Sequence, residues 1–451
     1  MPARLSGHRF FASSIKPMAG LFKLGLIWVG LATLLLMVAL PARPAFALSE
    51  EQELVAEVWR IVNRAYVDES FNHQNWWFIR QRILNRPLNS REETYQAIQE
   101  MLANLDDPYT RLLTPEQYRS LQTTTSGELT GVGLQIAKDQ KTGWLRVIAP
   151  ISGSPAEQQG LQPQDIVARI DDQETMLLSL DEAAARLRGP RGTTVKLEVW
   201  DERQQNHRTV VLTRELVSLN PVVASLKTTH TGHQVGYLRL SQFNSNAAAS
   251  IAKEITTLGR EGAQGYILDL RNNPGGLLQA GIEIARFWLS QGTIVYTVNR
   301  QGILDSFETY GQTITDAPLV VLVNEGTASA SEILAGALQD NGRAFLVGNV
   351  TFGKGLIQSL FDLSDGAGLA VTVARYETPS HRDINRQGIM PDHLISTAPL
   401  PQESLATEAD PQYQAALDLL SQSTTQTDIA NAYKKLLEKS TTGPDHYNQA
   451  A

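Results

Sequence analysis

Strand and helix patterns alternate between residues 236 and 376, and this alternation allows few folds. Each short apolar run reads as a buried strand, and segments with apolar residues at three- and four-residue steps read as amphipathic helices. Repeated strand–helix units predict a largely parallel sheet covered by helices. The predicted elements are Gly236–Leu240, Ala247–Leu258, Gly265–Leu270, Leu277–Leu289, Leu319–Val323, Ser331–Gln339 and Ala370–Tyr376.

Two differently patterned segments precede these units. Residues 50–122 show helical periodicity and predict an all-helical domain in which Trp76 and Trp77 pack. Residues 126–216 combine short β runs with two short helical patterns, which predicts a small β-rich barrel capped by two helices. The β runs are Val132–Ile136, Leu145–Ile148, Ile166–Ile170, Val195–Val199 and Thr209–Thr213, and the helical patterns are Ser154–Gln159 and Leu180–Arg188.

A chain of 451 residues is too long for a single hydrophobic core. Its last part is polar and carries two modest helical patterns, Gln412–Leu420 and Asp428–Glu438. We therefore expect a multidomain α/β protein. Its predicted parts are a signal peptide (1–47), an N-terminal helical domain (48–125), a β-rich module (126–216), an α/β core (217–400) and a C-terminal helical appendage (401–451).

The N-terminus predicts export. The first 23 residues contain four Lys or Arg and no acidic residue, and Leu24–Leu40 is an uncharged, largely apolar run. Small residues at Ala45 and Ala47 predict signal-peptidase cleavage after Ala47. The alternative is an uncleaved anchor, because the run approaches the roughly 18 to 20 residues that span a bilayer. Both alternatives place the body of the protein outside the cytosol.

Charge and residue content exclude several functions. The net charge is −8 and no Lys/Arg cluster occurs, so nucleic acid is not an expected partner. The absence of cysteine rules out disulfides, thiolate metal sites and thiol nucleophiles. No pair of histidines has the helical His-x-x-x-His spacing of a zinc metalloprotease. We expect neither a metal nor a cofactor.

Ser329 is a candidate nucleophile. The strand pattern Leu319–Val323 runs through a short turn into Ser329, and a helical pattern begins directly after it. A serine at such a turn is exposed and faces the N–H groups at the positive end of the helix dipole. The alternative is a helix-capping serine, the commoner use of this position.

A second turn, Arg271–Gly276, also joins a strand pattern to a helical one and contains paired glycines. Uncovered N–H groups of Gly275 and Ala330 could bind an oxyanion, a device worth roughly 3 kcal/mol per donor. A tight turn that needs positive φ explains the glycines equally well. The glycine spacing matches neither phosphate-binding motif, so a phosphate site is a weaker hypothesis.

Lys354 is the candidate base that could activate Ser329. It lies between Gly353 and Gly355 and precedes an apolar run, and desolvation there would lower the pKa of its amine. If the following run is a strand, Gln358 lies on the same face and could orient the amine. Without the neighbouring features, a surface lysine in a glycine turn would be the better interpretation.

Together these segments resemble the carboxyl-terminal processing (tail-specific) proteases. The run Thr327–Glu332, followed by Lys354 between glycines and by Gln358, is similar to the catalytic motif of that family. The resemblance implies a crotonase-like βα catalytic core. It also implies that Ser329 rather than Ser331 is the nucleophile, that Lys354 is the base, and that Gln358 is the partner of the base.

The same resemblance assigns further roles. It implies that Gly275 and Ala330 supply the oxyanion hole, and we give the family-matching Asp340 a structural role. The β-rich module resembles a PDZ domain through Gly131-Val132-Gly133-Leu134, the loop whose N–H groups would bind a terminal carboxylate, and through Ser154-Pro155-Ala156. A substrate tail would then add to an open sheet edge. The family further implies that PDZ movement gates the catalytic site.

The segment Phe71–Trp77 looks most like the photosynthetic branch, which trims the precursor tail of the photosystem II reaction-centre D1 protein. This implies protein substrates with a free C-terminal tail, associated with a membrane, in the thylakoid lumen or the periplasm. A general envelope tail-specific protease is the alternative. The crotonase-like fold also occurs in acyl-CoA hydratases, and a PDZ module also suits a non-catalytic tail-binding adaptor, but an adaptor has no need of Ser329 and Lys354.

Overall fold

The structure is a computed structural model that describes residues 48–139, 142–201, 206–398, 400–421, 423, 425–429, 431 and 433. The predicted signal peptide, residues 1–47, lies outside these residues, as does most of the helical pattern expected at Asp428–Glu438. No helix within them has both the length and the apolar character that crossing a bilayer requires. Residues Leu54–Ala451 form one compact unit.

Helices dominate the N-terminal part, as predicted, but they are joined by a short strand. Thr114 and Gln117 form a capping box that begins the fourth of these helices, with Pro115 at its first position. The prediction of an all-helical segment is wrong for Arg111–Leu113, because three residues are too few to show a β period. The elements are α2 (Glu50–Ala65), α3 (Trp76–Leu84), α4 (Arg91–Ala103), β1 (Arg111–Leu113) and α5 (Pro115–Ser126).

The β-rich module contains all the strands and both helices that its sequence predicts. Its main sheet has the order β3-β4-β5-β7-β8, so β3 lies at an edge, and β6 pairs with β5. A separate ladder joins β2 to β9. The elements are β2 (Glu128–Gly131), β3 (Leu134–Lys138), β4 (Leu145–Pro150), α6 (Pro155–Gln158), β5 (Ile166–Ile170), β6 (Gln173–Glu174), η1 (Thr175–Leu177), α7 (Leu180–Leu187), β7 (Thr194–Asp201), β8 (Asn206–Thr213) and β9 (Glu215–Ser218).

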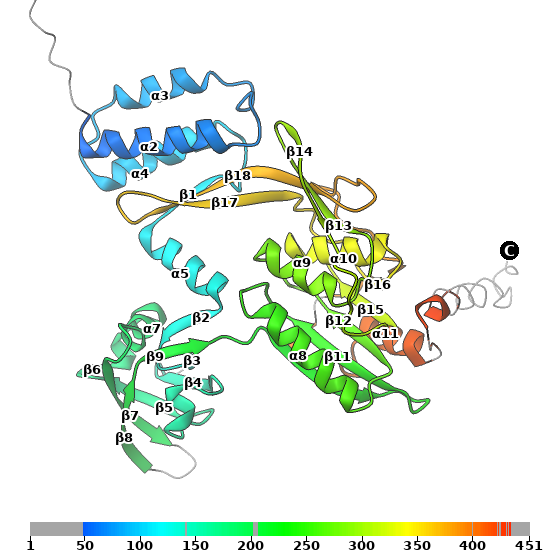
Figure 1. Cartoon of the computed structure of the whole chain (residues 1–451). Helices are drawn as coiled ribbons and strands as arrows, with labels where there is room; N and C mark the ends of the chain where they lie inside the picture. Colours follow the sequence, from blue (N-terminus) through cyan, green and yellow to red (C-terminus); the bar gives the residue numbers. More distant parts are fainter. Residues whose placement is uncertain are drawn as a thin grey trace, which may run out of the picture. The chain divides into compact units, whose positions relative to one another are not determined.

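A six-stranded sheet forms the centre of the α/β core, in the order β10-β11-β12-β15-β16-β19 (Figure 1). Strand β10 is antiparallel to β11, and all other neighbours are parallel, which confirms the predicted parallel sheet. The strands are β10 (Val222–Thr228), β11 (Gln234–Leu240), β12 (Gly265–Asp269), β15 (Leu319–Val323), β16 (Phe345–Gly348) and β19 (His393–Leu394).

Helices cover both faces of this sheet (Figure 1). Alternate residues such as Leu238 and Leu268 pack with α8 (Ala247–Arg260), α9 (Leu278–Arg286) and α10 (Ala330–Asp340). The opposite face, with Tyr237 and Ile267, packs under α11 (Pro411–Ser421). The expected C-terminal helix is therefore present, and it belongs to the core of the sheet rather than lying apart as an appendage.

A second sheet brings distant segments together and was mostly not predicted. Its order is β1-β18-β13-β14, with β17 also paired to β18, so β1 joins the N-terminal helices to the late strand of the core. Helices α2 to α4 pack on Leu369 and Val371 of β18 and on Leu363 in the turn between β17 and β18. The elements not yet named are β13 (Thr293–Asn299), β14 (Gly302–Glu308), β17 (Leu356–Asp362), β18 (Gly368–Glu377) and η2 (Gln402–Ser404).

Candidate active site

Ser329 lies where the sequence places it, at the turn between β15 and α10. Its φ of +57° is unfavourable for a residue with a side chain, and such strain is typical of functional turns. The turn is fixed from below: the Thr327 hydroxyl donates to the Leu270 carbonyl at 2.9 Å, and the Ala328 N–H donates to the Asn273 carbonyl at 3.0 Å. Ser329 is partly exposed between the buried residues Ala328 and Ala330.

Ser331 is used differently from Ser329. It is fully buried, and its hydroxyl donates to the Asn273 carbonyl at 3.0 Å. A buried hydroxyl that already donates a hydrogen bond within the protein cannot contact a substrate. Of the two serines, only Ser329 is partly exposed.

Gly275 is in contact with the Ser329 turn. Its φ is +94°, and a Cβ there would lie 2.6 Å from the Ala328 carbonyl oxygen and 2.8 Å from Ser329 Cβ. Only glycine fits at this position. The two predicted oxyanion donors are thus adjacent, since the same Cβ would lie 2.9 Å from the Ala330 nitrogen.

The two donors differ in their present bonding. The Gly275 N–H donates to Asn273 Oδ1 at 2.9 Å, whereas the Ala330 N–H has no hydrogen-bond partner among the described residues. Ala330 is the first residue of α10, where backbone N–H groups have no acceptor within the helix. An oxyanion could use this donor directly but would have to displace the Asn273 amide from the other.

Glu332 joins the serine turn to the lysine loop, a role that was not expected from the sequence. Its carboxylate is fully buried and accepts the N–H of Ser329 and the N–H of Lys354, both at 2.9 Å. It also accepts the Thr351 hydroxyl at 2.6 Å and the Gly353 N–H at 2.7 Å. A Ser-x-x-Glu spacing is a capping-box signal in the sequence, but the long-range bonds are visible only in the fold.

Lys354 lies in a loop whose glycines permit close packing, as predicted. A Cβ on Gly353 would lie 2.9 Å from the backbone nitrogens of Gln387 and Gly388. The Lys354 side chain is half-buried, and its Nζ lies 4.8 Å from the centre of the Tyr109 ring. Cation and ring at this distance attract each other.

The pKa of Lys354 is lowered from its ordinary value of 10.5. Burial is the largest cause, and the nearby Arg111 guanidinium lowers the pKa further, while Asp107 and Glu332 oppose the shift. This is the direction that the sequence predicts from the apolar neighbours. A lowered pKa makes the amine a better candidate for accepting a proton near neutral pH.

The lysine is not yet in place to act on the serine. Among the described residues, no hydrogen bond joins the Lys354 amine to Ser329 or to Gln358, and the Gln358 amide instead donates to Thr372 Oγ1 at 3.4 Å. Gln358 does lie on a strand, β17, but the β17–β18 register shifts between Ile357 and Gln358. Such an irregularity breaks the two-residue alternation on which the predicted Lys354–Gln358 contact depends.

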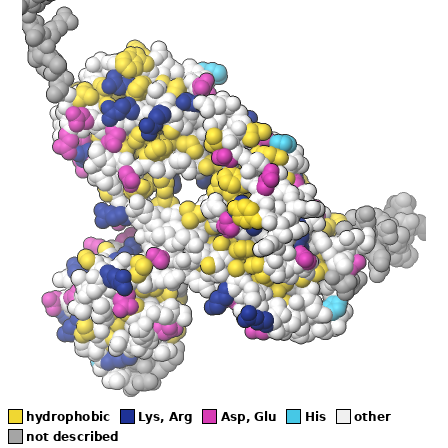
Figure 2. All heavy atoms as spheres, in the orientation of Figure 1, with side chains coloured by type: hydrophobic (Ala, Val, Ile, Leu, Met, Phe, Trp, Pro, Cys, Tyr) yellow, Lys and Arg dark blue, Asp and Glu magenta, His cyan; other side chains and the backbone are white. Residues whose placement is uncertain are grey.

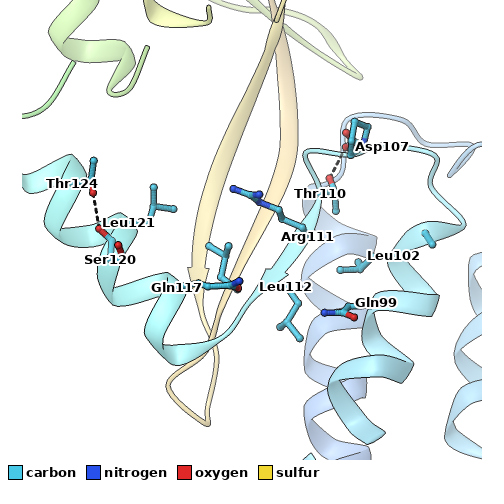
Figure 3. A pocket seen from close by; sticks show the side chains of 13 residues that line it. Gln99, Leu102, Asp107, Thr110, Arg111, Leu112, Gln117, Ser120, Leu121 and Thr124 are labelled. Carbon is cyan, nitrogen blue, oxygen red and sulfur yellow. Dashed lines mark hydrogen bonds between the residues drawn. The ribbon is translucent and has the colours of Figure 1, made fainter. Parts of the chain in front are cut away.

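A groove of about 710 Å³ lies between α4, β1 and α5 (Figure 3). The predicted catalytic residues do not line it, but Asp107 and Arg111 do, and both act on the pKa of Lys354. Asp107 is held by the Thr110 hydroxyl, which donates to it at 2.6 Å. No sequence pattern indicates this groove, because its walls come from elements that meet only in the fold.

The predicted carboxylate-binding loop, Gly131-Val132-Gly133-Leu134, connects β2 to the edge strand β3. Gly133 has a φ of +74°, and its carbonyl accepts the Ser154 hydroxyl at 3.1 Å and the Ile151 N–H at 2.9 Å. An open edge strand next to a shaped glycine loop is the arrangement that strand addition by a peptide requires.

Asp340 shows the bonding of a structural residue. It accepts the Ser380 N–H at 3.0 Å and also pairs with Arg382. Although burial raises its pKa, hydrogen bonds from Ser380 and Thr378 outweigh that effect and lower it. Among the described residues, no group of three or more Asp, Glu or His side chains is arranged to hold a metal ion.

Comparisons with known proteins show which family the chain is similar to. Residues 234–395 match peptidase family S41, and residues 146–201 match the PDZ domain. The chain is 60% identical over 396 residues to a carboxyl-terminal-processing protease of Picosynechococcus sp., covering 87% of this chain and 95% of that protein. A carboxyl-terminal-processing protease of Synechocystis sp. is 61% identical over 376 residues, covering 83% of this chain and 88% of that protein.

Among solved structures, the fold is similar to a photosystem II D1 C-terminal processing protease. The sequence identity is 42% and the TM-score is 0.53, and the match covers 81% of this chain and all of that one.

Proposed function

Because the chain belongs to the carboxyl-terminal processing proteases of peptidase family S41, we propose that it hydrolyses a peptide bond near the C-terminus of a protein through Ser329 and Lys354. The contact of the Ser329 turn with Gly275 and the unpaired Ala330 N–H is the observation that carries this assignment. The peptidase class itself follows from the family.

In the proposed first step, Ser329 Oγ attacks the scissile carbonyl carbon, and its proton passes to the neutral amine of Lys354. The carbonyl oxygen gains the negative charge and binds the N–H groups of Ala330 and Gly275. The protonated Lys354 then gives its proton to the leaving amine. Water attacks the acyl-enzyme by the same route and releases the shortened product.

This chemistry requires a rearrangement of the Lys354 and Gln358 side chains. The Lys354 amine must leave the Tyr109 ring and approach Ser329, and the Gln358 amide must exchange Thr372 for the lysine. Hydrogen bonds at catalytic sites are often incomplete before substrate binds. We propose that binding of the substrate tail drives this closure, since the buried Glu332 already holds both backbones in position.

For the fold, we propose a crotonase-like βα core over residues 217–400, with a PDZ barrel inserted at 126–216, an N-terminal helical domain at 48–125 and a C-terminal segment at 401–451. The PDZ barrel would bind the substrate tail by adding it to the edge strand β3, with the terminal carboxylate on Gly131-Val132-Gly133-Leu134. The chain would be exported to the thylakoid lumen or the periplasm. Its proposed substrate is the membrane-associated D1 precursor, because the similar solved structure is named for that processing reaction.

The test is cleavage of a synthetic D1-precursor tail peptide by the chain from Leu48 to Ala451. We expect Ser329→Ala to abolish cleavage, a chelator to have no effect, and C-terminal amidation of the peptide to weaken cleavage. Cleavage that persists in Ser329→Ala would refute the mechanism. Tight tail binding without cleavage by the unmutated chain would favour the adaptor instead.

The rate of cleavage is expected to rise with pH and to level off below 10.5, the ordinary pKa of lysine. Only the neutral amine accepts a proton, so kcat/KM follows the titration of Lys354 in the free enzyme. Arg111 lowers this pKa and Asp107 raises it. Arg111→Gln should therefore move the rising limb to higher pH, and Asp107→Asn should move it to lower pH; shifts in the same direction would contradict the assignment.

Replacing Glu332 with glutamine should lower kcat about 100-fold, the loss that a small misplacement of reacting groups produces. The N–H₂ group of the new glutamine would face N–H or O–H groups that now donate to the Glu332 carboxylate. The lost hydrogen bonds should lower the free energy of unfolding by about 1–3 kcal/mol. Glu182→Gln is the matched control, since Glu182 occupies the same capping-box position in α7 but, within the part of the chain that the structure describes, accepts hydrogen bonds only from Ser179. The measurements are kcat on the tail peptide and thermal unfolding of both variants. An unchanged kcat in Glu332→Gln would exclude a positioning role for Glu332.

A further inference from the structure

Helix α3 has an outer face that its own fold leaves uncovered. Trp77 is 57% exposed and Phe78 is 61% exposed, so the prediction that Trp77 packs inside the domain is wrong. Figure 2 shows hydrophobic and basic side chains side by side over this part of the molecule. Large aromatic side chains that are exposed to water at adjacent positions indicate an interaction surface.

The inner face of the same helix is already buried within the domain. Trp76 is buried and stacks on Phe71 with ring centres 5.4 Å apart, and Ile79 and Ile83 are also buried. These residues belong to the cluster that joins α2 to α4. The exposed aromatics therefore contribute little to the packing of the domain.

The outer face is also basic. No Asp or Glu occurs between Glu69 and Glu92, while Arg80, Arg82 and Arg86 all lie in that interval, in a chain whose net charge is −8. The one described acidic partner of this group, Glu100, pairs with Arg86 at a site that is exposed on both sides. An exposed pair of this kind is weak and can be exchanged for another anion.

The basic and aromatic side chains form one ordered group. The Arg80 guanidinium carbon lies 5.1 Å from the centre of the Trp77 ring and 5.3 Å from that of Trp59. The two rings meet edge to face at 5.6 Å. Aromatic rings and arginines at one level of a surface helix are the combination found at membrane–water interfaces, where rings sit among the headgroups and arginines contact phosphates.

We propose that α3 docks the protein on an anionic lipid bilayer, with Trp77 and Phe78 among the headgroups and with Arg80 and Arg82 on lipid phosphates. Charge decides between this surface and a second copy of the chain, because a symmetric dimer on this face would bring its arginines together. A bilayer with anionic lipids attracts such a basic face. This docking needs no catalytic residue, but it would hold the protease where the tail of a membrane protein emerges.

The test is cosedimentation of the chain from Leu48 to Ala451 with vesicles of phosphatidylcholine, with and without phosphatidylglycerol. We expect binding to the anionic vesicles, weakened by high salt, and at least a tenfold loss of affinity in the double variant Trp77→Ala/Phe78→Ala. Arg82→Glu, an exposed single change, should lose most binding without affecting the fold. Tyr310→Ala is the matched control, because Tyr310 is 74% exposed and stacks on Arg286 at 3.7 Å elsewhere on the surface.

The proposal is overturned by equal binding to neutral and anionic vesicles, by binding that survives both sets of changes, or by a dimer that Trp77→Ala/Phe78→Ala converts to monomer. Cleavage of a soluble peptide should be the same in all of these variants. Vesicle binding by a chain that cleaves no peptide would refute the proposed catalysis alone and leave the docking surface standing.

Discussion

Replacing Lys354 with methionine is expected to abolish peptide cleavage while leaving the fold at least as stable as before. Methionine keeps the length of the side chain but cannot accept a proton from Ser329. Loss of a positioned base lowers turnover by about 10²–10⁴-fold, and we expect the upper end of that range because no side chain among the described residues is hydrogen-bonded to the Ser329 hydroxyl; Glu332 accepts only the backbone N–H of Ser329. The rate should be measured as kcat on the tail peptide.

The stability of Lys354→Met carries independent information. Burial disfavours the charged amine, so the folded protein holds its proton less tightly than the unfolded chain does. The penalty is full at pH values below the lowered pKa and disappears as pH rises through it toward 10.5. Methionine removes the penalty, and the gain in unfolding free energy should therefore be larger at neutral pH than at high pH.

Lys253→Met serves as the control, because Lys253 is exposed on α8. It should change neither the rate nor the stability. An inactive Lys354→Met that is also strongly destabilised would mean that the lysine supports the fold instead of the chemistry.

Replacing Arg271 with methionine should destabilise the protein by about 3–5 kcal/mol, the usual cost of leaving buried charge unpaired. Arg271 is 3% exposed and lies between two carboxylates, with Nη2 at 2.6 Å from Asp269 and at 2.8 Å from Asp410. Its removal leaves both carboxylates buried without a cation. Asp410→Ala should cost less, since Arg271 then keeps Asp269 as its partner.

The destabilisation caused by Arg271→Met should also depend on pH. Burial raises the pKa of Asp410, but the hydrogen bonds and charge of Arg271 outweigh this and lower it. The wild-type protein therefore gains stability from Asp410 above the ordinary pKa of aspartate and loses it in acid. Without Arg271, burial raises the pKa of the Asp410 carboxyl, which becomes neutral in acid, so the difference in unfolding free energy between Arg271→Met and wild type should shrink as pH falls.

Denaturant unfolding over a range of pH measures this difference. Arg271 also begins the turn that carries Gly275, so peptide cleavage should fall together with stability. A stable Arg271→Met, or a destabilisation that does not depend on pH, would show that the two carboxylates find other partners.

The sequence predicted those parts of the fold that depend on local periodicity. The strands and helices of the α/β core are buried over their whole length on one or both faces, so their apolar patterns are clear; β15 and α10 are examples. The resemblance to carboxyl-terminal processing proteases, and with it the peptidase class, is confirmed by the relatives. The serine and glycine turns were found because both join a strand to a helix.

What the sequence could not show depends on contacts between distant segments. Strand β1 is three residues long and is a strand only because it pairs with β18. Glu332 reads as a helix cap, and its bonds to Gly353 and Lys354 depend on a loop that follows the next strand. The predicted Lys354–Gln358 contact assumed a regular strand, which the irregularity at Ile357 breaks.

The packing of α11 makes the order of synthesis important. Ribosomes deliver a chain from its N-terminus, and segments fold as they emerge. Until α11 is available, one face of the central sheet, including Tyr237, Ile267 and Leu322, is exposed to water, and Arg271 lacks Asp410. Arg271, which begins the turn that carries Gly275, therefore gains its second carboxylate only when almost the whole chain has been made.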